Sequence, residues 1–511
     1  MDMFDRMSGG SEILLHVDRS HPETLAGQVR AGLRDAIRSG RLAAGTRLPA
    51  SRVLAGDLGV SRGVVVDAYS QLAAEGFLVT RPGSATIVTD AVRITPAHVS
   101  WLQRHREPAS RLWRPELDLR PAGPDLALLP RSQGVRTMTD IFRHLPAAEF
   151  GYTGPWGPAR LRRQLGAHLG RVRAAMAPAD GIVVVTGGTQ ALTIIARTLA
   201  AAGHDRIAVE DPGAPMHRHL LQAHGLKTIP VPVDAEGLAV DVLVATGCQV
   251  VLASPSHQFP TGAVMSAERR ARLLEWAETH SALIIEDDRR ADFHFGRPAL
   301  ACLQGMRPAQ VILIGSISAT LAPAMRLGWI VPPPSLLRAI AETKRDDDFG
   351  TGMMEQHALA SWLESGQYDR HVRRSRRAYA TRRAELSRQL HQHFPGWLQH
   401  GSTAGLEILL ELPGSIAERH VVAHARQLGL GLSPLGPMRI RPAGPPGLVL
   451  SYARLPPRHC TEAVARLKLA VEAVLAENRS LTAAAIPSDS DEPWRLTSAD
   501  WPAAAEDFYA L

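Results

Sequence analysis

The sequence predicts a protein of two domains, a small winged helix-turn-helix followed by a larger α/β domain built on a mostly parallel sheet. Three observations carry this prediction. The chain has 511 residues, which is too long for one ordinary domain. Residues 25–89 indicate the order helix, helix, turn, helix and hairpin. From about residue 116 to 478, short runs rich in Val and Ile alternate with helical stretches.

The elements of the small domain follow from hydrophobic spacing and turn residues. Apolar residues spaced four apart over 25–37, followed by Gly40, predict a helix that ends near this glycine. SRVLAGDLG, residues 51–59, predicts a short second helix, and residues 61–76 predict a third. FLVTRPGSATIVT, residues 77–89, alternates around a Pro-Gly turn and predicts a β-hairpin.

The larger domain is expected to contain a parallel sheet with crossover helices. Five short apolar runs, at 181–188, 206–213, 249–256, 282–288 and 311–316, have the composition of strands buried on both faces. Helical stretches separate these runs, as the connections between parallel strands require.

The composition divides the chain into four segments. Residues 1–90 are expected to form the winged helix-turn-helix, with its core at 20–89. Residues 91–115 carry scattered Pro and Arg without periodicity and are expected to be a linker to the domain at 116–478. The tail, 479–511, has six acidic, two basic and four aromatic residues, and we expect it to be disordered.

Charge and cysteine content narrow the class of protein. The net charge of +7 is compatible with a nucleic-acid partner, but residues 1–90 carry ten Arg against ten Asp and Glu, so a DNA argument needs placed residues. No apolar run is long enough to span a bilayer, and the N-terminus lacks the apolar core of a signal peptide. The three cysteines are too scattered for a disulfide framework or a zinc site. A cytoplasmic protein with no membrane partner is therefore expected.

Three further sequence features are interpreted as ordinary surface residues and not as functional sites. The His-x-His pairs at 217–219 and 391–393 have no third ligand at metal spacing, so we expect surface histidines and no metal site. The run KRDDD, residues 344–348, is expected to be a solvated group of charges.

The helix-turn-helix contains the candidate DNA-reading residues. In this motif the N-terminal end of the second helix lies in the major groove. That end carries Ser61 and Arg62, and an arginine can bind a guanine edge or a phosphate. Arg52 begins the supporting helix, where it can reach the DNA backbone, and the hairpin tip at 83–86 can approach a groove. Periodicity alone leaves open a small helical domain with ordinary surface arginines.

Residues 40–88, GRLAAGTRLPASRVLAGDLGVSRGVVVDAYSQLAAEGFLVTRPGSATIV, resemble the DNA-binding domain of the GntR family over its whole length. The resemblance implies a double-stranded DNA operator as partner. By this resemblance Arg52, Arg62 and the wing glycine Gly83 contact DNA. The complete predicted DNA-binding set is Arg52, Ser61, Arg62, Gly83, Ser84 and Thr86. Gly63 departs from the family, which usually has a small hydroxyl residue after the recognition arginine.

Segments of the larger domain resemble class I aminotransferases of fold type I, the fold of pyridoxal-phosphate-dependent transferases. These segments are GYTGPWGPARLR (151–162), TGGTQAL (186–192), IIEDD (284–288) and LIGSISATLAPAMRLGW (313–329). A GntR-type domain fused to that fold describes the MocR subgroup of bacterial regulators. The resemblance covers most of the chain, and the pairing of domains is more specific than either motif.

The resemblance implies a pocket for the cofactor. The residues that it assigns to the cofactor phosphate are Gly188, Thr189, Gln190, Ser316, Ser318, Arg326 and, reaching a neighbouring subunit, Tyr152. Asp287 matches the carboxylate that keeps the pyridine nitrogen protonated, so that the ring acts as an electron sink.

Several positions that the chemistry needs have departed from the family. Ala319 stands where the lysine of the Schiff base belongs, and a methyl group cannot form an imine or return a proton. Arg289 replaces the tyrosine near the ring hydroxyl, and Ala214 replaces the aromatic residue that stacks on the ring. Val449 aligns with the arginine that binds the substrate carboxylate. Nearby alternatives for that arginine are Arg439, Arg441 and Arg454. We therefore expect no catalytic residue and no covalent cofactor.

Loss of the lysine leaves a buried acidic site, because an unpaired buried carboxylate must raise its pKa or find a partner. Arg289 lies two residues beyond Asp287, and residues at that spacing share one face of a strand. We expect Arg289 to replace the missing charge and to form an anion site with Arg326, for a small carboxylate or phosphate effector. The alternative is that Arg289 points to solvent.

These patterns predict a DNA-binding transcriptional regulator whose aminotransferase-like domain is a non-catalytic module for dimerisation and effector sensing. The resemblance implies a homodimer, and exchange of the DNA-binding domains between subunits is one arrangement. Two alternatives stay open: a pyridoxal-phosphate-dependent aminotransferase with a fused DNA-binding domain, and a regulator that holds pyridoxal 5′-phosphate non-covalently. The sequence gives neither the operator nor the effector.

Overall fold

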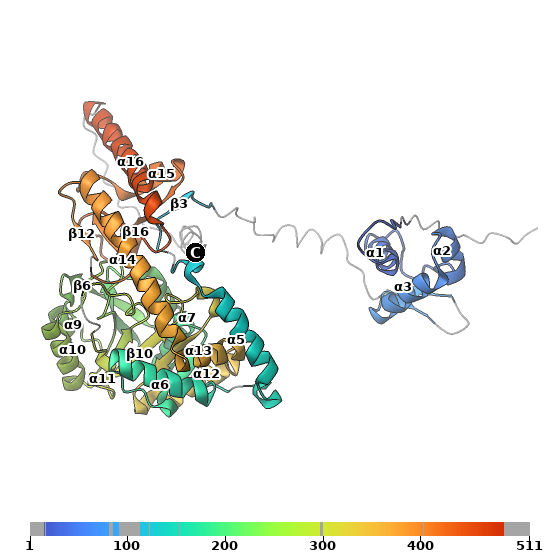
Figure 1. Ribbon diagram of the computed structural model, residues 1–511, viewed down its shortest axis with the longest axis horizontal. Coiled ribbons are helices and arrows are strands. Elements are labelled where there is room, and N and C mark those ends of the chain that lie inside the picture. Colours follow the sequence, from blue (N-terminus) through green and yellow to red (C-terminus); the bar gives the residue numbers. More distant parts are fainter. Residues whose placement is uncertain are drawn as a thin grey trace, which may run out of the picture. The chain divides into compact units, whose positions relative to one another are not determined.

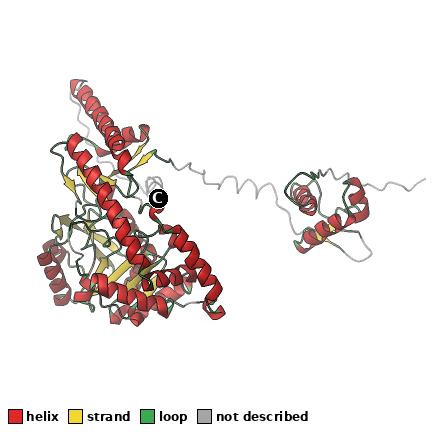
Figure 2. Cartoon of the chain, in the orientation of Figure 1, coloured by secondary structure: helices red, strands yellow, loops and turns green. Residues whose placement is uncertain are grey.

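The computed structural model describes residues 15, 17–80, 85–90, 113–121, 123–152, 154–296, 300–401 and 403–484. The chain divides after residue 112 into two compact units, and each has its own core. Figure 1 labels elements of both units where there is room, and Figure 2 colours the chain by secondary structure. Within the described ranges, no helix is long and apolar enough to cross a membrane.

The first unit consists of three helices and a short hairpin. Its elements are α1 (Leu25–Arg38), α2 (Ser51–Asp57), α3 (Arg62–Ala74), β1 (Leu78–Val79) and β2 (Ile87–Val88) (Figure 1). The two strands pair antiparallel, with Leu78 opposite Val88. This order confirms the predicted winged helix-turn-helix.

Capping and burial explain the ends and faces of these helices. Thr24 caps α1 by accepting a hydrogen bond from the amide of Gly27 at 3.2 Å, and the chain leaves the helix through Gly40 at φ 78°. The core residues with at most 1% exposure include Val29, Leu33, Leu54, Val65 and Leu72. These side chains pack α3 against both α1 and α2, while Arg62 and Gly63 in the first turn of α3 are exposed.

The second unit is built on an eight-stranded sheet. Its strands are β4 (Val183–Val185), β5 (Arg206–Asp211), β6 (Lys227–Asp234), β7 (Gly237–Leu238), β8 (Val250–Ala253), β9 (Leu283–Asp287), β10 (Val311–Ser316) and β11 (Gly328–Val331). They lie in the order β4-β11-β10-β9-β8-β5-β6-β7. Only β11 and the short β7 pair antiparallel to their neighbours. The predicted mostly parallel sheet is confirmed.

Helices cover the sheet, as Figure 2 shows. They are α5 (Arg131–His144), α6 (Ala159–Arg173), α7 (Gly188–Ala201), α8 (Pro215–Ala223), α9 (Val240–Thr246), α10 (Ala267–Thr279), α11 (Leu303–Met306), α12 (Pro334–Asp348) and α13 (Met353–Glu364). Short 3-10 turns lie at Leu126–Leu128, Ala147–Phe150, Ala179–Gly181 and Pro323–Met325. The central strands are buried on both faces, which explains their continuous runs of Val and Ile.

The C-terminal part of the second unit has its own smaller sheet. The long helix α14 (Gln367–His393) leads into β12 (Gln399–His400), β13 (Glu407–Glu411), β15 (Ser433–Pro434) and β16 (Gly447–Ser451), which are ordered β12-β13-β16-β15. A separate pair joins β3 (Leu117–Asp118) to β14 (Leu430–Gly431). The remaining elements are α15 (Glu418–Gln427), the 3-10 turn Gly436–Met438 and α16 (Pro457–Ala484). Helix α16 extends past residue 478, where the sequence suggested that the domain ends.

One expectation about charge is wrong in part. Residues 345–347 are exposed, as expected, but Lys344 on α12 is fully buried and pairs with Asp348. The Gln190 side chain donates to Asp348 at 2.8 Å and accepts from the backbone amide of Thr186 at 2.8 Å. Asp348 therefore ties α12 to the start of α7. An amphipathic helix pattern does not reveal this link, because Gln190 lies far from α12 in the sequence.

Candidate functional site

The first candidate surface is the exposed end of α3 in the first unit. Ser61 is the N-cap residue of α3, and Ser61, Arg62 and Arg52 are all exposed. The Arg62 Nε atom donates to the Ser51 hydroxyl at 3.4 Å, so the two helices of the motif are joined at the edge of this surface. Such an end can present an arginine to a base edge and hydroxyls to phosphates.

The hairpin supplies less of the predicted surface. Gly83 and Ser84 lie outside the described residues. Thr86 is partly buried, and its carbonyl accepts a hydrogen bond from the Leu48 amide at 2.8 Å. The backbone of Thr86 therefore holds the hairpin to the segment before α2.

The second candidate site is a cavity of about 330 Å³ in the second unit, at the carboxyl ends of the central parallel strands. The ends of β9 and β10 contribute Asp287 and Ser316, and the start of α7 contributes Gly188 and Thr189. In open α/β sheets ligands bind at this edge, because loops diverge there and helix amides point into the opening.

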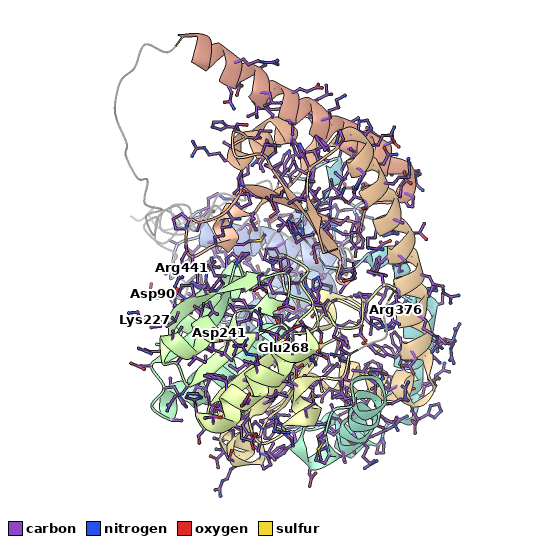
Figure 3. All side chains as sticks on the ribbon, turned by 90° about the vertical axis from the view of Figure 1, so that its left-hand side faces the viewer. Asp90, Lys227, Asp241, Glu268, Arg376 and Arg441 are labelled. Atoms are coloured by element: carbon purple, nitrogen blue, oxygen red, sulfur yellow. The ribbon has the colours of Figure 1, made fainter. Side chains whose placement is uncertain are left out.

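The cavity has no amine at the position that the predicted chemistry needs. Ala319 lies on the cavity wall just after β10, with 9% exposure. No lysine is among the residues that line the cavity. Lys227 begins β6 and is exposed (Figure 3), and Lys468 lies beside Glu472 on α16. The cavity wall of this subunit therefore carries no lysine amine that could form an imine with a ligand.

A bidentate ion pair occupies the acidic end of the cavity. Arg289 donates from Nε to Asp287 Oδ1 at 2.7 Å and from Nη2 to Oδ2 at 2.6 Å. The Asp287 and Arg289 side chains are 12% and 22% exposed. Burial alone would raise the pKa of Asp287, but the guanidinium outweighs it and holds this pKa well below the ordinary value. Arg289 does not point away into solvent, so that alternative is wrong.

His217, on α8, is a part of this site that sequence reasoning missed. Arg289 Nη2 lies 2.5 Å from His217 Nε2, and since a guanidinium can only donate, the imidazole nitrogen accepts. Burial, with Arg289 as the next cause, lowers the pKa of His217 to about 3, which keeps the ring neutral. The expectation of surface histidines at 217–219 is therefore wrong for His217, although His219 is exposed.

The opposite end of the cavity has the polar groups expected for an anion. Gly187, at φ 102°, precedes the first turn of α7, and Thr189 and Ser318 line the wall. Arg326 also lines the cavity, is exposed, and has no ion-pair partner among the residues that the structure describes. A helix N-terminus, hydroxyls and an unpaired guanidinium together favour a negative ligand group.

Two predicted cofactor residues lie elsewhere. Gln190 is not part of the cavity wall, because its side chain is bonded to Asp347 and Asp348 of α12. Tyr152 is 95% exposed, and its ring centroid lies 6.3 Å from that of the exposed Phe349. Within one subunit, therefore, neither side chain reaches the cavity.

The end of the cavity nearest the smaller sheet lacks the free arginine that would bind the carboxylate of an amino-acid substrate. Val449 is fully buried in an apolar cluster with Leu409, Leu435 and Met438. Arg290, which is not among the predicted site residues, lines the cavity but donates to Glu407 Oε1 at 2.6 Å. The three arginines near Val449 in sequence also lie outside the cavity wall: Arg439, Arg441 (labelled in Figure 3) and Arg454, which donates to Asp118 at 2.8 Å.

The residues present do not fit pyridoxal 5′-phosphate in the geometry of its enzymes. Asp287 would have to bond the pyridine nitrogen, but both of its oxygens are taken by Arg289. Arg289 also lies directly over Gly188, since a Cβ added to this glycine would come within 2.8 Å of the Arg289 Cζ. A side chain of the protein thus lies beside Gly188 and Asp287, where the resemblance places the cofactor phosphate and the pyridine nitrogen.

The fold and the two candidate sites define a helix-turn-helix regulator joined to an aminotransferase fold, and comparisons with known proteins agree. The sequence model of the family "Aminotransferase class I and II" matches residues 139–467, and that of "Bacterial regulatory proteins, gntR family" matches residues 25–88. The chain belongs to the MocR group of GntR-family transcriptional regulators.

Two curated relatives are similar over most of the chain. The probable rhizopine catabolism regulatory protein MocR of Rhizobium meliloti is 30% identical over 473 residues, which cover 89% of this chain and 96% of the relative. The HTH-type pyridoxine biosynthesis transcriptional regulator PdxR of Corynebacterium glutamicum is 34% identical over 375 residues, covering 73% and 80%.

Solved structures support the fold of the second unit. The α-aminoadipate aminotransferase LysN of Thermus thermophilus has a TM-score of 0.65 at 24% identity, and the match covers 71% of this chain and 93% of that one. An archaeal alanine:glyoxylate aminotransferase has the same TM-score at 23% identity, over 74% and 94%. At these identities the similarity concerns the fold alone.

Proposed function

We propose that this regulator binds an operator through its first unit and that its aminotransferase-like unit senses a small anion without catalysing transamination. The observation that carries the loss of catalysis is Ala319 on the wall of a cavity that no lysine lines. Transamination needs an amine that exchanges with the substrate amine and moves a proton at the α-carbon. The cavity supplies neither.

Charge supports the anionic class of effector. Of the four arginines on the cavity wall, Arg289 is paired with Asp287 and Arg290 with Glu407. Arg218 donates to the carbonyls of Gly213, Pro437 and Met438. These neutral acceptors satisfy its hydrogen bonds but do not neutralise its positive charge. Burial raises the pKa of Glu210 on the same wall to about 7, which weakens the opposing negative charge near neutral pH. A carboxylate or phosphate is the ligand class that this surplus favours.

Exposed aromatic residues support a homodimer as the working form. Tyr152 and Phe349 form one exposed aromatic pair, and the ring centroids of Phe142 and Phe150 form a second at 6.1 Å. Large exposed apolar side chains that gather in this way are typical of protein interfaces. A two-fold dimer would also present two DNA-reading helices to a two-fold operator.

The experiment that tests DNA recognition is selection of bound duplexes from a random library by the full-length protein, followed by gel-shift titration of the enriched site. We expect an enriched sequence that binds with at least about a thousandfold preference over random duplex. The matched control is the Arg62→Ala protein, which should lose most of the preference but keep its fold. Equal affinity for enriched and random DNA would contradict the proposed function.

The alternative that pyridoxal 5′-phosphate binds non-covalently rests on the polar end of the cavity, where Thr189, Ser318 and Arg326 could receive its phosphate. The pairing of Asp287 with Arg289, and the position of the Arg289 side chain over Gly188, argue against it.

A further inference from the structure

We infer that Arg289 is a built-in substitute for the protonated pyridine ring and makes the cavity exclude pyridoxal phosphates in favour of anions that lack such a ring. The inference deepens the proposed effector site and does not depend on DNA binding. Arg289 would then be the residue that sets ligand specificity.

The first step is that Arg289 already engages both carboxylate oxygens of Asp287. A protonated pyridine nitrogen offers one N–H donor to a carboxylate, whereas a guanidinium offers two parallel donors at fixed spacing. Arg289 uses both, at 2.7 and 2.6 Å, so no oxygen of Asp287 keeps its best acceptor direction free. A ring entering the cavity would have to break a charge-assisted bidentate pair to gain a single hydrogen bond.

The second step is the position of the Arg289 side chain. It crosses from the end of β9 to the first residue of α7, where it contacts Gly188. His217 holds the guanidinium from a third side through its accepting Nε2. The arginine is therefore fixed by three different elements, β9, α7 and α8, and does not simply swing across open space.

The third step is the cost of displacement. If a ring pushed Arg289 aside, a guanidinium that is 22% exposed would lose its carboxylate, and the neutral His217 beside it could not compensate. Uncompensated buried charges are costly. An anion avoids this cost, because it can bind between Arg326 and the outer edge of the same guanidinium and leave the pair with Asp287 in place.

The test compares two probes by calorimetry on the full-length protein. Pyridoxine 5′-phosphate has the ring and the phosphate but no aldehyde, so it cannot label exposed lysines such as Lys227, and inorganic phosphate has no ring. With the unmodified protein we expect pyridoxine 5′-phosphate to bind no tighter than inorganic phosphate. With Arg289→Ala we expect pyridoxine 5′-phosphate to gain about tenfold or more in affinity while inorganic phosphate gains nothing, since removal of a cation alone can only weaken anion binding.

The matched control is Arg290→Ala. Arg290 is the next residue and lines the same cavity, but it is bonded to Glu407 and lies over the Phe259 ring at 4.8 Å. This variant loses one positive charge from the cavity without freeing Asp287, so no gain for the ring is expected. A gain of the same size in Arg290→Ala would overturn the inference, because general loosening would then explain both.

Other outcomes are equally decisive. If the unmodified protein binds pyridoxine 5′-phosphate more than about tenfold tighter than inorganic phosphate, the ring is accepted and the inference is wrong. It is also wrong if folded Arg289→Ala, checked by its thermal unfolding, shows no gain. Arg289→Gln keeps more of the side-chain volume and replaces Arg289→Ala if that variant does not fold. If Arg289→Ala gains affinity for pyridoxine 5′-phosphate but the protein does not recognise DNA, this inference holds and only the proposed function is contradicted.

Discussion

Removing the charge of Asp287 tests the ion pair on which the cavity is built. In Asp287→Asn the Arg289 guanidinium keeps a neutral acceptor but loses its counter-charge. With N–O distances of 2.6 and 2.7 Å the charge centres lie about 4 Å apart, which corresponds to an attraction of about 4 kcal/mol at an effective dielectric of 20. Loss of one partner of a buried pair costs about 3–5 kcal/mol, so we expect a destabilisation of about 3 kcal/mol, because the pair is slightly exposed.

A double-mutant cycle isolates this interaction. Asp287→Asn, Arg289→Gln and the double variant are compared by urea unfolding, with tryptophan fluorescence as the signal. The double variant removes both charges and should be more stable than the sum of the single changes predicts, by about 2 kcal/mol or more. A coupling energy near zero would contradict the account, since it would mean that the two side chains act independently and that Arg289 does not hold Asp287.

Three further predictions concern other parts of the molecule. Arg62→Ala should weaken operator binding by about 1–3 kcal/mol if it grips a guanine, whereas Arg52→Ala should weaken specific and random duplexes alike; gel-shift titrations in which neither changes would contradict the winged-helix assignment. Ala319→Lys alone should give at most a poor aldimine, seen as weak absorbance that borohydride bleaches, because Arg289 still pairs with Asp287 and the aromatic residues expected at positions 214 and 289 are still missing; efficient turnover by this variant would contradict that. His217 has a folded pKa of about 3, below its unfolded value, so the unfolded state takes up the proton first and stability falls as pH drops below about 6.5. His217→Gln should lessen this fall by up to about 1.4 kcal/mol per pH unit between about pH 6 and 4 in urea titrations, and His219→Gln, at an exposed position on the same helix, should not.

Elements that depend on local pattern were predicted well from the sequence. The strands that end at Ser316 and Asp287 are continuous apolar runs, and burial on both faces requires that composition. Strand β6 was missed because KTIPVPVD contains two prolines, which are disfavoured in central strands. The antiparallel β11 was missed because its direction is set by the pairing with β10 and β4, which no local signal gives.

The candidate site was predicted only in part, for a related reason. The pairing of Arg289 with Asp287 could be inferred, since two residues that are close in sequence meet at one strand end. Its contact with Gly188 and the acceptor role of His217 could not, because those residues come from other elements that tertiary packing brings together. Gln190 fits the motif by sequence, but its amide is bonded to Asp347 and Asp348 at the C-terminal end of α12.

The loss of transamination is the central claim, and a direct rate measurement tests it. The purified full-length protein, incubated with pyridoxal 5′-phosphate, an amino acid and a 2-oxo acid, is assayed for the new amino acid against two controls, the free cofactor and an active class I aminotransferase. The account predicts no formation above the free-cofactor rate for any common amino donor. Turnover that scales with protein concentration would contradict it, because a cavity with Ala319 and no lysine on its wall offers no amine to carry the exchange.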